Sequence, residues 1–539
     1  MPVTRIENAT VWTGERSQVD GQVIVTDAIA FDDDGILALG EAAHALPAGV
    51  VVDAAGGFVA PGFRDGHVHS IQGGFERSIA PVRDHATPQD IAKAVGAWAA
   101  EHPEVEWVRG EGFDHTLAPN GVFLAAWLDA EVPDRPAVLR ATDYHTVWVN
   151  SEALRRAGYT AQSPQPHDGE IVMDENGEPT GTLREWGAWR PVYNLMPKLT
   201  REQGVSALTY TADCFSGAGL TWVQDAWVEP NDVELWLAAH EAGVLTFRAD
   251  LGLWCDPNSW RDQLDHFVAT RERVAASAPG RLTATTIKFF ADGVIESATG
   301  AMLEPYCDCP HSVGLPNWDP DELKAAVAAV DGLGFSPHIH AIGDAAARMA
   351  LDAIEHANAV NGARDRRATI AHTQLVDHTD IDRFVQLGVI ANFEPYWAKY
   401  DSWQTALTAP RLGKERTDRQ YMIKSILATG APISFGSDWP VTTYAPLAGM
   451  QVAVTRQMTE GDFLDPWMPE ERISVEQALA GYTAGVAFQG GDERAGVLRP
   501  GARADIVMLG SDPRAVPALE IEAVEVIGTW CDGRRVFGG

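Results

Sequence analysis

The chain has 539 residues, of which 45% are hydrophobic and 22% are charged, and its 75 acidic residues outnumber its 41 basic ones to give a net charge of −34. This composition is typical of a folded globular protein and excludes a disordered or fibrous chain. The acidic excess argues against nucleic acid or an anionic membrane as a partner, because both are bound through clustered Lys and Arg.

Both ends of the chain are predicted to form β-structure. Residues 1–60 contain short strands with alternating apolar positions, such as TRIENATVW and QVIVTDAIAFDD, separated by Gly and Asp turns. Residues 490–539 repeat this pattern in GARADIVMLG and EAVEVIGTWCDGRRVF. We therefore expect one small β domain completed by both ends, with no helix in its N-terminal part.

Residues 61–489 alternate short apolar strands with helical segments. After a first strand in GFRDGHVHS, the strand candidates are GLTWVQDA, TFRADLGLW, TATTIKFFADG, SPHIHAIGD, ATIAHTQ, GVIANFEPYW and APISFGSDWP. Eight such strands close a parallel (β/α)₈ barrel, and we predict this α/β fold. A doubly wound open sheet is the alternative, but no Gly-rich phosphate-binding turn follows the first strand.

The alternation is interrupted between about residues 72 and 200. This stretch is rich in Trp, Pro and Asp. A structureless loop of this length is not expected inside a compact domain. We interpret it as a large insertion after the first barrel strand and expect it to cover the mouth of the barrel.

Two histidines lie two residues apart in APGFRDGHVHS, at His67 and His69. Residues i and i+2 of a strand project from the same face, so both rings can reach one metal ion. This spacing also arises by chance among ordinary core and surface histidines. The motif alone is therefore weak evidence for a metal.

Four more strand ends carry side chains of the kinds found in metal sites: Lys288, the pair His338 and His340, His372, and Asp438. In a parallel barrel the C-terminal ends of all strands meet at one mouth, so these side chains converge with the HxH pair. Each one alone is more often a hydrogen-bonded barrel residue than a ligand. The whole set is hard to explain by packing and predicts a metal site.

These motifs resemble the amidohydrolase superfamily, and more narrowly its amidohydrolase-3 branch, which includes N-substituted formamide deformylase-like enzymes. The resemblance covers nearly the whole chain and rests on motifs such as APGFRDGHVHS, DRPAVLRATDYHTVWVNSEAL, GEPTGTLREW, IKFFADGVIESATGAMLEPY, HAIGD, FGSDWPV and GVLRPGARADIVMLGSDP. It implies a TIM-type barrel beside a small β-sandwich formed by both chain ends. It also implies one or two divalent metals at the mouth, usually Zn²⁺.

The ligand set implied by the resemblance has six members: His67, His69 and Asp438 for the first metal, His340 and His372 for the second, and Lys288 as an N-carboxylated bridge. An ammonium cannot ligate a dication, whereas a carbamate supplies two anionic oxygens that can span ions ~3.5–4 Å apart. An unmodified Lys288 facing Asp292 or a substrate anion is the alternative, and predicts a single-metal site. The motif HAIGD selects His340 as the ligand and leaves His338 as a supporting or core residue.

The resemblance implies hydrolysis of an amide- or formamide-type C–N bond, and a zinc site suits hydrolysis because zinc lowers the pKa of a bound water toward ~7 and polarises a carbonyl. Asp438 is the expected general base and acid. His145, in TDYHTVW, is a candidate to contact the carbonyl oxygen, the alternative being a capped loop histidine. The 18 tryptophans favour an apolar or aromatic amide as the small-molecule substrate, although core packing explains most of them.

Two other functions stay open at this stage. The first is a mononuclear enzyme of the same fold, such as a deaminase, in which Lys288 is unmodified; the number of metal ions per chain would discriminate. The second is a non-catalytic binding protein on the same scaffold. An intact ligand set with Asp438 beside it argues against the second, because a binding module has no use for a free base next to a metal.

The cytoplasm is the expected location. The first residues, MPVTRIENATVW, lack the basic start and apolar stretch of a secretory signal, and no window approaches the ~18 apolar residues of a membrane span. Five cysteines are too few, and odd in number, for a disulfide framework. A zinc knot in CDCPH is disfavoured because no second pair follows at finger spacing. The sequence leaves open whether the chain is a monomer or a homodimer.

Overall fold

The computed structural model describes residues 2–19, 21–461 and 463–538, and it confirms the predicted barrel. Eight strands form one parallel sheet in the order β20-β19-β18-β17-β16-β15-β14-β8. They are β8 (Phe63–Val68), β14 (Leu220–Val228), β15 (Arg248–Trp254), β16 (Leu282–Phe290), β17 (Ser336–Ala341), β18 (Thr369–His372), β19 (Ile390–Phe393) and β20 (Ile433–Phe435). The N–H groups of Ser437 and Asp438 donate to the carbonyl of His67, at 3.2 and 2.8 Å, and join the two edges of the sheet.

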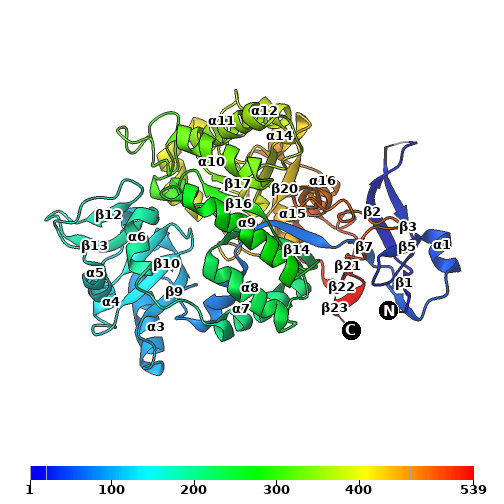
Figure 1. Cartoon of the computed structure of the whole chain (residues 1–539), viewed down its shortest axis with the longest axis horizontal. Coiled ribbons are helices and arrows are strands. Elements are labelled where there is room, and N and C mark those ends of the chain that lie inside the picture. The colour runs from blue at the N-terminus through cyan, green and yellow to red at the C-terminus, as the bar shows by residue number, and fades with distance from the viewer. Residues whose placement is uncertain (1, 20, 462, 539) are drawn as a thin grey trace.

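Helices surround this barrel in the centre of Figure 1. They include α7 (Arg201–Gly217), α8 (Pro230–Glu241), α9 (Trp260–Ser277), α10 (Pro320–Gly332), α11 (Asp344–Asn361), α12 (Ile381–Leu387), α14 (Ile423–Ala428) and α16 (Val475–Ala480). The helix α11 buries Ala346, Ala350, Ile354 and Ala357 at helical spacing, as its sequence predicts. Small side chains on this stripe allow the helix to approach the sheet closely.

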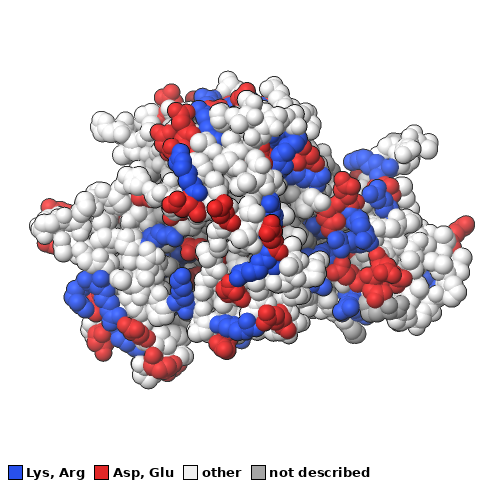
Figure 2. Space-filling model, in the orientation of Figure 1, with Lys and Arg blue, Asp and Glu red and all other residues white. Residues whose placement is uncertain are grey.

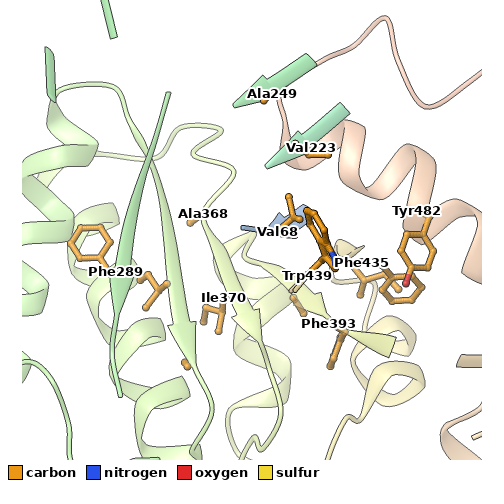
Figure 3. Close-up of a cluster of buried hydrophobic side chains, with 14 of the residues drawn as sticks. Val68, Val223, Ala249, Phe289, Ala368, Ile370, Phe393, Phe435, Trp439 and Tyr482 are labelled. Carbon is orange, nitrogen blue, oxygen red and sulfur yellow. The ribbon is translucent and has the colours of Figure 1, made fainter. Parts of the chain in front are cut away.

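The layer between strands and helices is apolar. Figure 3 shows Ile370 of β18, Phe393 of β19 and Phe435 of β20 beside one another, with Tyr482 packed against Phe435. These side chains are buried, and they belong to one continuous hydrophobic cluster. Since alternate residues of a strand face opposite sides, the outward apolar residues leave the positions between them free to face the barrel interior. This alternation places polar side chains at the mouth.

Both chain ends contribute to one further sheet, at the right of Figure 1. Its order is β23-β22-β21-β7-β2-β3, which joins β2 (Thr10–Arg16), β3 (Val23–Thr26) and β7 (Phe58–Pro61) to β21 (Ile506–Leu509), β22 (Val526–Cys531) and β23 (Arg534–Phe537). A four-stranded sheet of β1 (Thr4–Glu7), β4 (Ile29–Phe31), β5 (Ile36–Leu39) and β6 (Val50–Asp53) packs with it. The limits 1–60 and 490–539 for this unit, and 61–489 for the barrel, stay a prediction.

The expectation of a helix-free N-terminal part is wrong. A short helix, α1 (Gly40–Ala45), follows β5. Gly40 has a left-handed backbone, with φ of +54°, which ends the strand and turns the chain. The next residues, Glu41 to Ala45, include three alanines and so favour one helical turn, which strand alternation alone does not reveal.

The chain between β8 and β14 carries a separate mixed sheet, seen at the left of Figure 1. It consists of β9 (Val108–Phe113), β10 (Ala137–Ala141), β11 (Thr146–Val149), β12 (Glu170–Met173) and β13 (Pro179–Arg184), with α3 (Pro88–Glu101) and α6 (Glu185–Tyr193) beside it. The loop before β11 and the start of α6 reach the barrel mouth. Residues from this insertion therefore line the site described below.

Acidic and basic side chains are interspersed on the face shown in Figure 2. Within the described ranges, no helix combines the length and the apolar character that crossing a bilayer requires.

Candidate functional site

Three of the predicted residues form a tight cluster at the barrel mouth. His67, His69 and Asp438 are buried, and one potential ligand atom from each lies within 4.8 Å of the others. Asp438 Oδ1 lies 3.0 Å from His69 Nε2 and 3.4 Å from His67 Nε2. Asp438 has a left-handed backbone, with φ of +52°, directly after the eighth strand, and such strain in a non-glycine residue is often found at functional sites.

The orientation of His67 is fixed by a second histidine. His338 Nε2 lies 2.9 Å from His67 Nδ1, so one of the two nitrogens donates to the other, and Nε2 of His67 is left to face the cluster. His338 itself is almost fully buried. Its position beside a potential ligand agrees with a supporting residue, since a histidine ligand usually has its other nitrogen held by a hydrogen bond.

Lys288 also reaches this cluster. Its Nζ lies 3.2 Å from His67 Nε2 and above the ring of Phe290, and the side chain is fully buried. Burial lowers the pKa of Lys288 to about 7, although Asp438, Glu394 and Asp225 act in the opposite direction. The predicted alternative partner, Asp292, does not contact Lys288.

The Asp292 carboxylate instead holds two loops together. It accepts hydrogen bonds from the backbone N–H groups of Ala301, Ile342 and Gly343, at 2.7, 3.1 and 2.9 Å. Burial raises the pKa of Asp292 to about 7. The Asp292 side chain therefore positions the chain that follows β17 rather than neutralising a lysine.

His340 and His372 complete a ring of imidazoles at the mouth. The ring centroid of His372 lies 4.6 Å from that of His67 and 4.5 Å from that of His340. Nδ1 of His372 lies 2.9 Å from Glu394 Oε2, and Nε2 of His340 lies 3.0 Å from the carbonyl oxygen of Gly293. One nitrogen of each ring is thus engaged, which leaves His372 Nε2 and His340 Nδ1 as the potential metal ligands.

Simple strand alternation does not place His372 in the mouth. His340 pairs with Ala371, so Ala371 shares its inward face and His372 would point outward. His372 instead has φ of +72° and Thr373 has φ of +44°. This left-handed backbone turns the imidazole inward, where its ring stacks on Trp397 at 5.4 Å.

The residues present suit a divalent metal. Imidazole nitrogens and a carboxylate oxygen are the donor types that zinc prefers in proteins. Among the described residues, Asp438 Oδ1 has no well-oriented hydrogen bond although it is buried. Burial acts to raise the pKa of Asp438, but the close approach of His69 and the charges of His372 and Lys288 outweigh it, so the pKa lies below its usual range. An ionised, unsatisfied carboxylate oxygen beside imidazoles fits a cation.

His145 reaches the mouth from the insertion. Its ring centroid lies 5.2 Å from that of His340, and its Nδ1 lies 2.8 Å from Glu185 Oε2. Glu185 is fully buried, and its other oxygen accepts from the hydroxyl of Thr299. Burial acts to lower the pKa of His145, but the charge and hydrogen bond of Glu185 outweigh it and raise the pKa. His145 is therefore held by a carboxylate rather than free in a loop.

A cavity of about 250 Å³ opens beside the imidazoles. Its walls include aromatic side chains from Tyr396, Trp397, Trp403 and Tyr421, and it also borders His145, His372 and Asp438. A smaller enclosed space behind it is bordered by His67, His69, Trp186 and Trp227. The site thus combines a polar floor with aromatic walls, the usual composition of a small-molecule pocket.

The structure brings together all seven predicted site residues: His67, His69, His145, Lys288, His340, His372 and Asp438. Sequence reasoning missed Glu185 and Glu394, which hold two of the histidines, and Trp227, Trp403 and Lys399, which border the two spaces. Glu185 and Glu394 lie in the segments GTLREW and GVIANFEPYW, but nothing in one sequence pairs them with particular histidines. The CDCPH cysteines are exposed free thiols, and the metal-type cluster within the described residues does not include them.

Comparison with known proteins finds matches over most of the chain. A family model described as "Amidohydrolase family" matches residues 50–537. N-substituted formamide deformylase of Arthrobacter pascens is 27% identical over 91% of this chain and 90% of its own, and Protein LONG AFTER FAR-RED 3 of Arabidopsis thaliana is 29% identical over 99% and 91%.

Solved structures share the fold. A metal-dependent hydrolase of Pyrococcus horikoshii has a TM-score of 0.74 at 21% identity, covering 96% of this chain and 99% of its own. Atrazine chlorohydrolase TrzN of Arthrobacter aurescens, complexed with zinc, has a TM-score of 0.55 at 17% identity, covering 99% and 95%. These likenesses confirm the barrel architecture.

Proposed function

The chain belongs to the amidohydrolase family, and from that premise we propose that it is a metal-dependent hydrolase that cleaves the C–N bond of a small amide or formamide. The observation that carries the proposal is the buried cluster of His67, His69 and Asp438, which borders an aromatic-walled cavity. The similarity to a protein named as an N-substituted formamide deformylase supports this choice of bond.

In this proposal the chain holds one or two Zn²⁺ ions through the ligand set His67, His69, Asp438, His340, His372 and a carboxylated Lys288. The bound metal would polarise the substrate carbonyl and lower the pKa of a water molecule toward ~7. Lys288 takes its place in the set only as a carbamate, because an ammonium has no lone pair to donate. Its amine is enclosed among these same residues, which supports that role.

Asp438 would move the proton. Its carboxylate is ionised and adjoins the cavity, so it can accept a proton from the attacking water and return it to the leaving nitrogen. In its protonated form, which Glu185 favours, His145 would donate a hydrogen bond from Nε2 to the carbonyl oxygen, where negative charge develops. Glu185 acts through His145, because it accepts a hydrogen bond from Nδ1–H and its charge favours the imidazolium, the form in which Nε2 also carries a proton.

The aromatic walls define the expected substrate. Trp397 stacks on His372, and Trp403 also lines the cavity. A flat apolar or aromatic body would stack on these rings while its amide group faces the imidazoles. The substrate proposed is therefore an N-formyl or N-acyl derivative of an aromatic or apolar amine.

Incubation of the purified enzyme with a panel of N-formyl and N-acyl amines tests the proposal. We expect release of free amine from an aromatic member such as N-benzylformamide, loss of that activity after chelation, and recovery on adding Zn²⁺. Metal analysis and intact mass are measured on the same sample, where carboxylation adds the mass of CO₂. Failure to release amine from any member of the panel, with metal bound, would refute amide hydrolysis.

A mononuclear deaminase-type enzyme is the second candidate. It is favoured by the fact that the metal-type cluster found among the described residues contains only His67, His69 and Asp438. Three results together would support this candidate. Metal analysis would give about one zinc ion per chain, the intact mass would show no carboxylation of Lys288, and an aromatic amidine-like substrate would release ammonia. Two ions and a carbamate would decide against it.

The substitution Glu185→Gln is expected to lower kcat about 10- to 100-fold and to leave KM nearly unchanged. A neutral Gln side chain no longer favours the protonated ring, and in a neutral ring that donates from Nδ1 to the Gln oxygen, Nε2 is an acceptor and cannot donate to the carbonyl oxygen. Steady-state kinetics on the best panel substrate measures this split. Thr299→Val, which removes a hydroxyl bonded to Glu185 and to the backbone of Val294, is the control and should have a smaller effect. An unchanged kcat in Glu185→Gln would exclude the positioning role.

A further inference from the structure

A second cavity, of about 220 Å³, lies between the insertion and the barrel on the far side of Trp227 from the metal-type cluster. Four cationic side chains border it: Arg109, Arg140, Arg190 and Lys198. Trp227 borders both spaces, and its ring contacts that of His69 at 6.1 Å. The second cavity is therefore adjacent to the proposed active site but separated from it by an indole ring.

Arg140, on β10, is the unusual member of this group. Its side chain is buried, with the residue only 3% exposed, and its Nε has no hydrogen-bond partner among the described residues. Aromatic rings surround its guanidinium, with centroids 4.5 to 5.5 Å away, from Tyr193, Trp189, Tyr144 and Trp227. Within the described chain no carboxylate lies within ion-pair distance of it, and buried guanidinium groups are normally paired.

The carboxylates at this cavity are engaged elsewhere. Glu111 lies 3.1 Å from Arg109 and also accepts from the hydroxyl of Tyr144, while Glu229 lies 3.9 Å from Arg190. Asp232 accepts from the backbone N–H of Glu229 at the start of α8, and burial raises its pKa to about 7. Four cations thus face three carboxylates, and Arg140 has none of them as a direct ion-pair partner.

Arg190 borders this cavity and also the neighbouring one that contains Trp254, and it offers a second unused donor. Its Nη1 is buried without a hydrogen-bond partner among the described residues, while its guanidinium stacks on Trp254 at 4.1 Å. The remaining walls include Ile71, Phe75, Trp189 and Leu199, which are apolar. An anion with a flat, apolar body could accept hydrogen bonds from the unused N–H groups and pack its apolar body against these walls.

We propose that this cavity is a binding site for a small organic carboxylate, held by Arg140 and Arg190 and enclosed by Trp189, Tyr193 and Trp227. The fork of a guanidinium matches the two oxygens of a carboxylate, and its charge strengthens both hydrogen bonds. The aromatic faces hold the body of the ligand. This site is independent of the metal-type cluster and does not depend on the reaction proposed above.

Calorimetric titration of the full-length, metal-loaded protein with benzoate tests the proposal. Benzyl alcohol is the neutral probe of matched shape, and a crystal soaked in 4-bromobenzoate locates the ligand by the anomalous signal of bromine. We expect saturable benzoate binding that weakens with ionic strength, bromine in the cavity beside Arg140, and no binding of benzyl alcohol.

Arg140→Met and Arg190→Met should each weaken benzoate binding about 10- to 100-fold. Arg273→Met is the matched control, since Arg273 is an exposed cation paired with Glu234 and its loss should leave the affinity unchanged. Any of three results would overturn the proposal: bromine found only beside His67 and Asp438, no saturable binding of benzoate, or equal benzoate affinities in all variants. If Arg140→Met does not fold, Arg190→Met and the bromine position decide.

Discussion

Replacement of Asp438 by Asn should lower kcat by about 10²- to 10⁴-fold, the range that general acid–base groups contribute. Asn is nearly the same size and can still offer an oxygen to a metal, but it cannot accept a proton at neutral pH. Circular dichroism and metal analysis should therefore show a folded protein that keeps much of its metal. The measurement is kcat on the best panel substrate.

Asp401→Asn is the matched control for this prediction. Asp401 borders the same cavity, and its Oδ1 accepts hydrogen bonds from the backbone N–H groups of Trp403 and Gln404, both at 3.1 Å. An Asn oxygen can accept the same bonds, so we expect kcat to be nearly unchanged although a negative charge is lost. An Asp438→Asn enzyme that turns over at the rate of the wild type would rule out Asp438 as the proton carrier.

Removal of both rings in the double variant His67→Ala and His69→Ala should reduce turnover to background. These two imidazoles and Asp438 form the buried donor cluster. Losing two of its three donors leaves too few ligands to hold a metal ion there. We expect metal affinity to fall well over about 100-fold, since even an outer residue behind a ligand contributes 10- to 100-fold. Metal analysis after dialysis, followed by activity with excess Zn²⁺, measures both effects.

Two single variants provide a milder loss of metal binding and a control. His338→Gln removes the imidazole that lies 2.9 Å from His67 Nδ1, so a 10- to 100-fold loss of metal affinity is expected. His85→Ala changes a half-buried histidine outside the site and should have no effect. Full metal content in the double variant would mean that the ion is held by other residues.

The barrel was predictable because its pattern is local. Each strand shows an apolar run followed by a helical repeat, and the number of repeats matched the number of strands that close a barrel. The short helix α1 was missed because six residues are too few for a period to emerge from a sequence read as alternating. The local sequence pattern therefore did not predict α1.

The candidate site was only partly predictable, because only some of its residues are placed by the local pattern of their own segment. His67 and His69 are two residues apart, and His340 faces inward by alternation, so each could be placed from its own segment. His372 faces inward only because its backbone is left-handed, which alternation does not predict. The partners of the histidines, Glu185 for His145 and Glu394 for His372, are 40 and 22 residues away and belong to other elements.

By itself, the sequence determined the order of the barrel strands and their helices, the family, and the residue types able to bind a metal. These depend on side-chain periodicity and on short motifs, which neighbouring residues establish without reference to the rest of the chain. Tertiary structure alone decided which nitrogen of each imidazole is free, how the insertion delivers His145, and that Arg140 is enclosed by aromatic rings without a carboxylate. Those features arise from contacts between distant segments, and such contacts exist only once the barrel has closed.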